Sequence, residues 1–178
     1  MEERCGRLIL AGGASGLASA ILAIFFLETL WLAPGVLFAT CVVAPWARMC
    51  GWSPKRIWII SVLCVLGYFA AYSIVNTTGG FLAPVGTAIG TTIMLIPAFL
   101  DDVPAVRRAA RRALIVGIVA AFVFTGFAFV PQEWWVALLW MIVWQVAVAA
   151  ALAPAAQRAS ATKATVDIVK GGCPRQAW

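Results

Sequence analysis

A series of long apolar runs constrains this chain more than any other feature of its sequence. An α-helix needs about 17–25 apolar residues to cross roughly 30 Å of hydrocarbon, and backbone polar groups in lipid must be satisfied within the helix itself. Runs of about this length cover residues 8–27, 30–47, 57–75, 81–100, 113–130 and 134–153. We therefore predict an all-α integral membrane protein, a six-transmembrane-helix bundle made of three hairpins.

Composition supports this class and excludes an ordinary soluble domain. The chain is 63% hydrophobic and 11% charged, whereas soluble domains are about 45–50% apolar and about 25% charged. We predict one transmembrane domain, residues 1–153, followed by a cytoplasmic C-terminal tail, residues 154–178. The first two runs are separated by a short turn around Glu28, so one long helix followed by a re-entrant segment is the alternative there.

The basic residues all fall on one side of this six-helix arrangement. They lie before the first helix, in the second and fourth loops and in the tail: Arg4, Arg7, Arg48, Lys55, Arg56, Arg107, Arg108, Arg111, Arg112, Arg158, Lys163, Lys170 and Arg175. Membrane proteins retain Lys and Arg in their cytoplasmic loops. We predict that both termini are cytoplasmic and that the protein resides in the bacterial cytoplasmic (inner) membrane. The net charge of +6 then reflects topology and does not indicate a nucleic acid partner.

A polar and aromatic face on the third predicted helix is the first candidate for a binding site. Its members recur every three or four residues, as one face of a helix requires: Ser61, Cys64, Tyr68 and Tyr72. Thr87 and Thr91 share a face of the fourth predicted helix. Helical hydroxyls often bond to a carbonyl one turn back, whereas aromatic walls with few polar contacts are typical of small-molecule sites. We predict that Tyr68, Thr87 and Thr91 line a solute cavity that opens to the outside.

Gln145 is the second candidate, because it stands near the middle of the sixth predicted helix among apolar neighbours. An amide has two donor hydrogens and an acceptor oxygen, so it should face other helices and not lipid. A hydrogen bond that joins two helices and a contact with solute both fit this position. We include Gln145 with Tyr68, Thr87 and Thr91 as predicted substrate-binding residues. Trp144, on an adjacent stripe, is interpreted as a core or lipid-facing residue.

Two surfaces are candidates for contact with a partner subunit. Gly12 and Gly16 belong to a stripe of small residues on the first predicted helix, which allows close packing within the bundle or against another membrane protein. A short amphipathic helix predicted from Pro104 carries a broad basic surface suited to lipid headgroups or to an acidic cytoplasmic partner. That surface consists of Arg107, Arg108, Arg111 and Arg112.

Several kinds of chemistry lack the residues that they need. The chain has no histidine, and its five cysteines form no CxxC pair, so the usual zinc and haem ligand sets and an imidazole base are missing. It contains no Gly-rich phosphate loop, GxSxG elbow or HExxH motif. We predict no enzyme activity, no cofactor and no metal. No charged residue lies inside a predicted span, which disfavours a proton relay.

These features together predict a small-solute transport component, either a permease or a substrate-capturing membrane subunit, for a neutral or weakly polar solute. No family motif is identified. In its six helices, its cytoplasmic termini and the small-residue face of its first helix, the chain resembles in outline the substrate-capturing membrane subunits of energy-coupling-factor vitamin transporters. The main alternative is a non-catalytic membrane scaffold or assembly subunit, and a membrane enzyme is the third. A transporter requires an internal cavity, whereas a scaffold requires a filled interior with its small-residue faces turned outward.

Overall fold

The computed structural model of the chain describes residues 2–30, 32–78, 82–127, 139 and 141–156. The helices in these ranges are α1 (Glu2–Leu30), a second helix (Ala33–Met49), α4 (Pro54–Thr77), α5 (Ala83–Phe99), α6 (Pro104–Phe127) and a C-terminal helix (Met141–Ala156). No strand occurs among the described residues. For this part of the chain, the prediction of an all-α fold with six helices is confirmed.

The second helix has three segments: α2 (Ala33–Phe38), the π-helical turn η1 (Ala39–Val43) and α3 (Ala44–Met49). In the wide turn, the N–H of Ala44 donates to the carbonyl of Ala39, five residues back. The next residue, Pro45, has no N–H to continue a regular ladder, and such a break accompanies widened turns. The helix ends at Met49, and Gly51, whose φ is 80°, closes it in a left-handed turn.

The helices extend further toward the charged residues than the apolar runs do. Both α4 and α6 begin with a proline, which is tolerated at a first helical position because its missing N–H has no partner there. The separate short amphipathic helix predicted from Pro104 is therefore wrong: its arginines form the first turns of α6. Alanine and arginine both favour the helical conformation, so a helix can continue past the end of an apolar run. The apolar run marks the stretch compatible with lipid, and it does not mark the end of the helix. The C-terminal helix likewise continues past residue 153 to Ala156, while most of residues 134–140 lie outside the described ranges.

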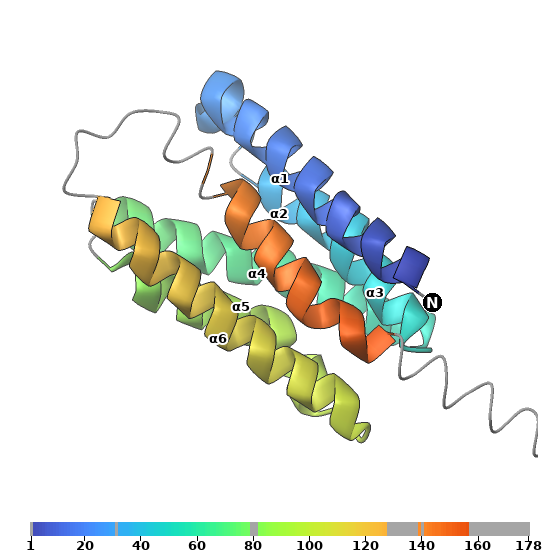
Figure 1. Cartoon of the computed structure of the whole chain (residues 1–178). Coiled ribbons are helices and arrows are strands. Elements are labelled where there is room, and N and C mark those ends of the chain that lie inside the picture. The colour runs from blue at the N-terminus through green and yellow to red at the C-terminus, as the bar shows by residue number, and fades with distance from the viewer. Residues whose placement is uncertain (1, 31, 79–81, 128–138, 140, 157–178) are drawn as a thin grey trace, which may run out of the picture.

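Successive helices run in alternating directions, so that loops and helix ends gather at two ends of the bundle (Figure 1). One end, which we call the basic end, holds the start of α1, the turn between α3 and α4, the turn between α5 and α6, and the end of the C-terminal helix. Every Lys and Arg within the described ranges lies in these turns or in the adjoining helical turns. The opposite end, which we call the distal end, holds Leu30, Thr77, Ala83 and Phe127.

Small residues let the helices approach each other closely. A Cβ added to Gly67 of α4 would collide with the carbonyl oxygen of Gly90 in α5. A Cβ on Gly16 of α1 would lie 2.8 Å from the Cα of Ile142, and one on Gly12 would lie 3.1 Å from the carbonyl oxygen of Gln145. The chain's own C-terminal helix therefore covers the Gly12 and Gly16 face of α1. Of the two roles considered for the Gly12 and Gly16 stripe, this contact corresponds to packing within the bundle.

Large apolar side chains point outward from the same helices. On α6, Ala113 and Ala121 are buried, whereas Ile115 is 60% exposed and Phe122 is 64% exposed. On α4, Trp58 is 69% exposed. Within the described ranges, two helices are long and apolar enough to cross a membrane, namely the stretch Cys5–Leu22 of α1 and the whole of α4. Shorter apolar helices are Ala33–Met49, Pro84–Phe99 and Met141–Ala156.

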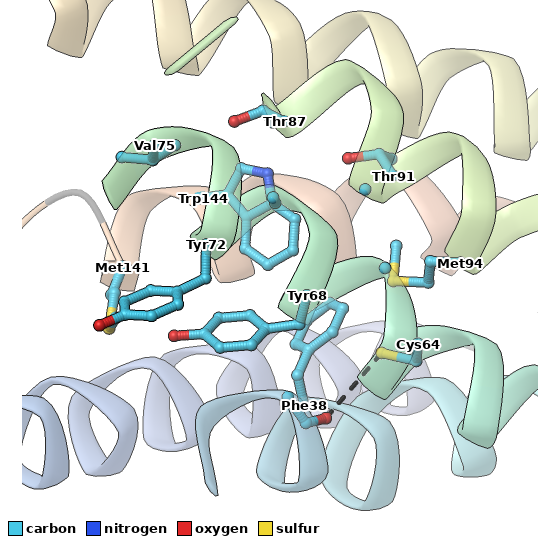
Figure 2. A pocket seen from close by; sticks show the side chains of 14 residues that line it. Phe38, Cys64, Tyr68, Tyr72, Val75, Thr87, Thr91, Met94, Met141 and Trp144 are labelled. Atoms are coloured by element: carbon cyan, nitrogen blue, oxygen red, sulfur yellow. Dashed lines mark hydrogen bonds between the residues drawn. The ribbon is translucent and has the colours of Figure 1, made fainter. Parts of the chain in front are cut away.

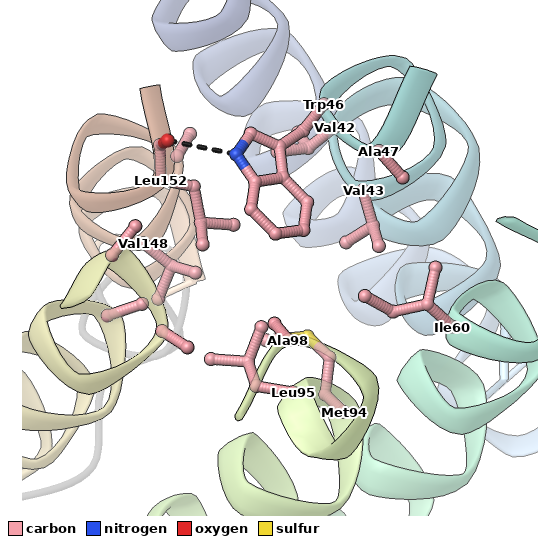
Figure 3. Packing of buried hydrophobic residues seen from close by; sticks show 14 of the residues in the cluster. Val42, Val43, Trp46, Ala47, Ile60, Met94, Leu95, Ala98, Val148 and Leu152 are labelled. Atoms are coloured by element: carbon pink, nitrogen blue, oxygen red, sulfur yellow. Dashed lines mark hydrogen bonds between the residues drawn. The ribbon is translucent and has the colours of Figure 1, made fainter. Parts of the chain in front are cut away.

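The half of the bundle next to the basic end is filled by tightly packed apolar side chains. Trp46, Ile60, Leu95 and Leu152 are all fully buried there and come from four different helices (Figure 3). The indole N–H of Trp46 donates to the carbonyl oxygen of Leu152 over 2.9 Å, which satisfies its one donor. This filled half contrasts with the distal half, where the helices enclose a cavity.

Candidate solute site

A cavity of about 90 Å³ lies in the distal half of the bundle (Figure 2). Its walls come from α2, α4, α5 and the C-terminal helix: Gly35, Phe38, Cys64, Gly67, Tyr68, Ala71, Tyr72, Val75, Thr87, Gly90, Thr91, Met94, Met141 and Trp144. Phe38, Cys64 and Met94 also belong to the packed core, so they form the floor that separates the cavity from the filled half. None of the lining side chains is a carboxylate, a lysine, an arginine or a histidine.

Aromatic rings form much of the wall. The rings of Tyr68 and Tyr72 lie nearly parallel, with their centroids 6.4 Å apart and planes at 11°. Phe38 and Trp144 meet at a tilt, with centroids 5.3 Å apart. Tyr68 is held by α2, because its Cβ lies 3.0 Å from the position that a Cβ on Gly35 would take. The aromatic walls expected from the spacing of Tyr68 and Tyr72 are present, and Phe38 and Trp144 extend them.

Thr91 differs from its neighbouring hydroxyl residues. Thr92 donates to the carbonyl of Ala88 over 2.7 Å, and Ser61 donates to that of Ile57 over 2.9 Å, as helical hydroxyls commonly do. The hydroxyl of Thr91, which is 1% exposed, is buried without a hydrogen-bond partner. Buried polar groups in folded proteins are nearly always hydrogen-bonded, so this exception requires an explanation.

Trp144 has the same property. Its indole nitrogen is buried and has no acceptor, whereas that of Trp46 is satisfied. Figure 2 shows the nitrogen turned toward α5, between the side chains of Thr87 and Thr91. Two unsatisfied polar atoms, Thr91 Oγ1 and Trp144 Nε1, thus belong to residues that line the cavity, but both atoms are buried and lie beside Gly117 of α6, which does not line it.

Gln145 faces elsewhere. It is 1% exposed, and its Nε2 donates to Ser19 Oγ of α1 over 3.1 Å. Its Oε1 is buried without a partner, as is the hydroxyl of Ser15 one turn before Ser19. Gln145 is not among the residues that line the cavity. The structure therefore brings Tyr68, Thr87 and Thr91 together around one cavity and puts Gln145 at the contact between α1 and the C-terminal helix.

Several residues of this site, among them Phe38, Met94 and Trp144, were not predicted from the sequence. Phe38 and Met94 resemble any other apolar residue of a predicted span, and no pattern in the sequence distinguishes them. Trp144 was interpreted as a core or lipid-facing residue; it packs against the core on one side and lines the cavity on the other. Only Trp144 carried a signal in the sequence, because the N–H of a buried indole needs a hydrogen-bond acceptor.

An ion pair ties the turns of the basic end together. Arg56 contacts the nearly buried Asp101 over 2.9 Å, donates to the carbonyl of Pro97 over 2.8 Å and stacks over the ring of Trp52 at 4.2 Å. Burial, with a smaller contribution from the charge of Asp101, raises the pKa of the nearby Cys50 thiol to about 12. In the described ranges no three metal-binding side chains gather into a cluster. The basic end is thus closed by contacts among its own residues.

Comparisons with protein-family models, with curated proteins and with solved structures found no match to this chain.

Proposed function

We propose that this protein is a membrane-embedded helical bundle that binds a small neutral solute in its distal cavity, as a transport component. The observation that carries the proposal is the cavity itself, which has aromatic walls above a packed floor. The half nearest the basic end is filled, so solute would enter from the distal side.

The outer surface of the bundle supports the membrane part of the proposal. Apolar side chains recur along the outward stripes of several helices, for example Val62, Leu66 and Phe69 on α4 and Ile115, Val119 and Phe122 on α6. Soluble proteins rarely expose contiguous apolar surface on this scale, whereas in lipid it costs nothing. The basic end would then face the cytoplasm by the positive-inside rule. In this orientation the chain lies in the bacterial inner membrane and all six helices span it.

The lining restricts the solute. A charged molecule would lose its hydration without gaining a counter-charge, because the lining side chains are all uncharged types. Ligand sites for drug-sized molecules have volumes of about 300–1,000 Å³, so a cavity of about 90 Å³ fits a molecule of only a few heavy atoms. A neutral or weakly polar solute of this size is the one that the site accommodates.

The exposed arginines of α6 offer a binding surface for a partner protein that supplies the energy for transport. Arg107, Arg108, Arg111 and Arg112 are all exposed at the basic end. They suit anionic lipid headgroups or the acidic surface of a cytoplasmic partner that drives transport. A permease driven by the solute gradient alone would use the arginines for lipid contact only.

Native mass spectrometry of the purified protein tests the proposal. We expect a co-purified small molecule in one-to-one ratio with the chain. Val75→Trp should abolish this adduct, because Val75 lines the cavity and an indole would fill it. Val85→Trp is the matched control, since Val85 is 47% exposed and lies outside the lining, and it should keep the adduct.

A different result would favour the alternative. If the protein carries no small molecule and arrives bound to another membrane subunit in all three forms, it is a scaffold, and the cavity is a packing defect. An adduct that survives Val75→Trp would place the solute elsewhere and contradict the proposed site.

A further inference from the structure

We propose that the distal cavity binds a hydrocarbon group, so that it favours an apolar molecule over one of the same shape that carries an oxygen atom. This inference rests on the proposed solute cavity and adds the chemical class of its ligand. It follows from the directions in which the polar atoms of the lining residues point.

Two of these polar atoms lie in the wall and not in the cavity. A Cβ built on Gly117 of α6 would lie 3.3 Å from Trp144 Nε1 and 3.5 Å from Thr91 Oγ1, and both atoms are buried. Gly117 does not line the cavity. Thr91 and Trp144 therefore contribute carbon atoms to the cavity surface, while their polar atoms face α6.

The floor of the cavity is also without a free donor. The thiol of Cys64 donates to the carbonyl of Gly35 at 4.0 Å, the contact drawn as a dashed line in Figure 2. The other floor side chains, Phe38 and Met94, consist of carbon and a thioether sulfur, which is at most a weak acceptor. Among the described residues that form the floor, none can donate an N–H or O–H to a solute.

The remaining hydroxyl groups lie at the distal edge of the cavity. Figure 2 shows the hydroxyls of Tyr68 and Tyr72 pointing past Met141, away from the floor, and the hydroxyl of Thr87 also on the distal side. The two tyrosines thus present the faces of their rings to the cavity. A molecule seated on the floor contacts carbon and sulfur.

Such a surface favours hydrocarbon for two reasons. A buried water needs two to four polar partners, so an apolar cavity stays dry and takes up apolar molecules instead. A carbonyl oxygen would lose its hydration on entry and gain no donor, which is costly. The flexible thioether side chains of Met94 and Met141 can adapt to the outline of a hydrocarbon group.

Cyclopentane and cyclopentanone are suitable probes, because they have nearly the same shape and differ by one carbonyl oxygen. The protein would be labelled with ¹³C in its methionine methyl groups, in lipid nanodiscs, and each signal assigned by a Met→Leu variant. We expect cyclopentane to shift the signals of Met94 and Met141 in a saturable way. Met49, at the end of α3 and outside the lining, should not respond. Cyclopentanone should bind at least about tenfold more weakly at equal free concentration in water.

Four variants test the location. Val75→Trp should abolish the response to cyclopentane, while Val85→Trp should keep it, and an unchanged Met49 signal shows that each protein is folded. Thr91→Val and Tyr68→Phe remove hydroxyls that do not face the floor, so they should leave the affinity for both probes unchanged.

The outcomes separate this inference from the proposed function. If cyclopentanone binds as tightly as cyclopentane, its oxygen finds a donor, so this inference fails and the proposed function stands. If neither probe gives a saturable shift of Met94 and Met141, both fail. A nuclear Overhauser effect between the Met94 methyl group and lipid acyl protons, before any probe is added, would show that the end of a lipid chain fills the cavity. The preference for hydrocarbon would then stand, and the proposed transport of a small solute would fail.

Discussion

Gln145 shows what a single residue in a helix sequence can and cannot reveal. Its depth follows from counting along the helix, and its need for a partner follows from its chemistry. Its direction does not follow, because adjacent residues on a helix lie about 100° apart, so Trp144 and Gln145 face different neighbours. The indole turns to the cavity, and the amide turns to Ser19 of α1.

Gln145→Leu should therefore leave solute binding intact. The substitution removes a hydrogen bond of 3.1 Å to Ser19 Oγ, but it also removes a buried carbonyl oxygen that has no partner. Interhelical hydrogen bonds in membrane proteins contribute only about 0.6 kcal/mol on average, so the free energy of unfolding should change by less than about 1 kcal/mol. Thermal unfolding in detergent and the adduct in native mass spectra measure the two effects. Loss of the adduct from a stable Gln145→Leu protein would make Gln145 a solute ligand after all.

At the scale of elements, the sequence predicted the existence of the six helices and their order, but their ends and contacts only in part. Apolar length identified every helix because lipid-compatible stretches must be continuous. It misplaced the start of α6 because arginines near a helix end do not interrupt the helix. The glycines indicated close packing, yet the partner of each glycine stripe depends on how the helices pair in space. The contact of Gly12 and Gly16 with a helix far along the chain could not be read from spacing.

Gly67→Ala should destabilise the bundle strongly. The added methyl group would collide with the carbonyl oxygen of Gly90, and backbone atoms of a packed helix cannot move aside as a flexible side chain can. Overpacking of this kind costs about 1–3 kcal/mol. Thermal unfolding of Gly67→Ala and of Gly13→Ala in the same detergent provides the comparison, because both replace a helical glycine. Gly13→Ala should be neutral or slightly stabilising, since alanine favours helix and has room there. Equal stability of the two proteins would mean that α4 and α5 are not in contact at Gly67.

On the scale of the whole molecule, the bundle is polarised along its axis. The basic end combines exposed cations with a packed interior and the pair of Arg56 with Asp101, whereas the distal half contains the cavity. The sequence predicted the clustering of charge because alternating helices return every second loop to the same end. It could not predict that packing would fill one half and leave the other hollow, since this depends on side chains from helices distant in sequence, such as Trp46 and Leu152.

The polarity can be tested by cysteine labelling of intact cells with a membrane-impermeant maleimide. In a protein whose native cysteines are replaced by alanine, Thr77→Cys at the distal end should be labelled from outside, and Lys55→Cys at the basic end should be labelled only after the membrane is opened. Both positions are exposed, so access and not burial decides the result. Native Cys50 is a poorer reporter of the basic end than Lys55→Cys. Its pKa is raised to about 12, and the reactive thiolate is therefore scarce at neutral pH and increases about tenfold per pH unit up to that value. Labelling of Lys55→Cys from outside would invert the proposed orientation, and labelling of both positions from one side would show that α4 does not cross the membrane.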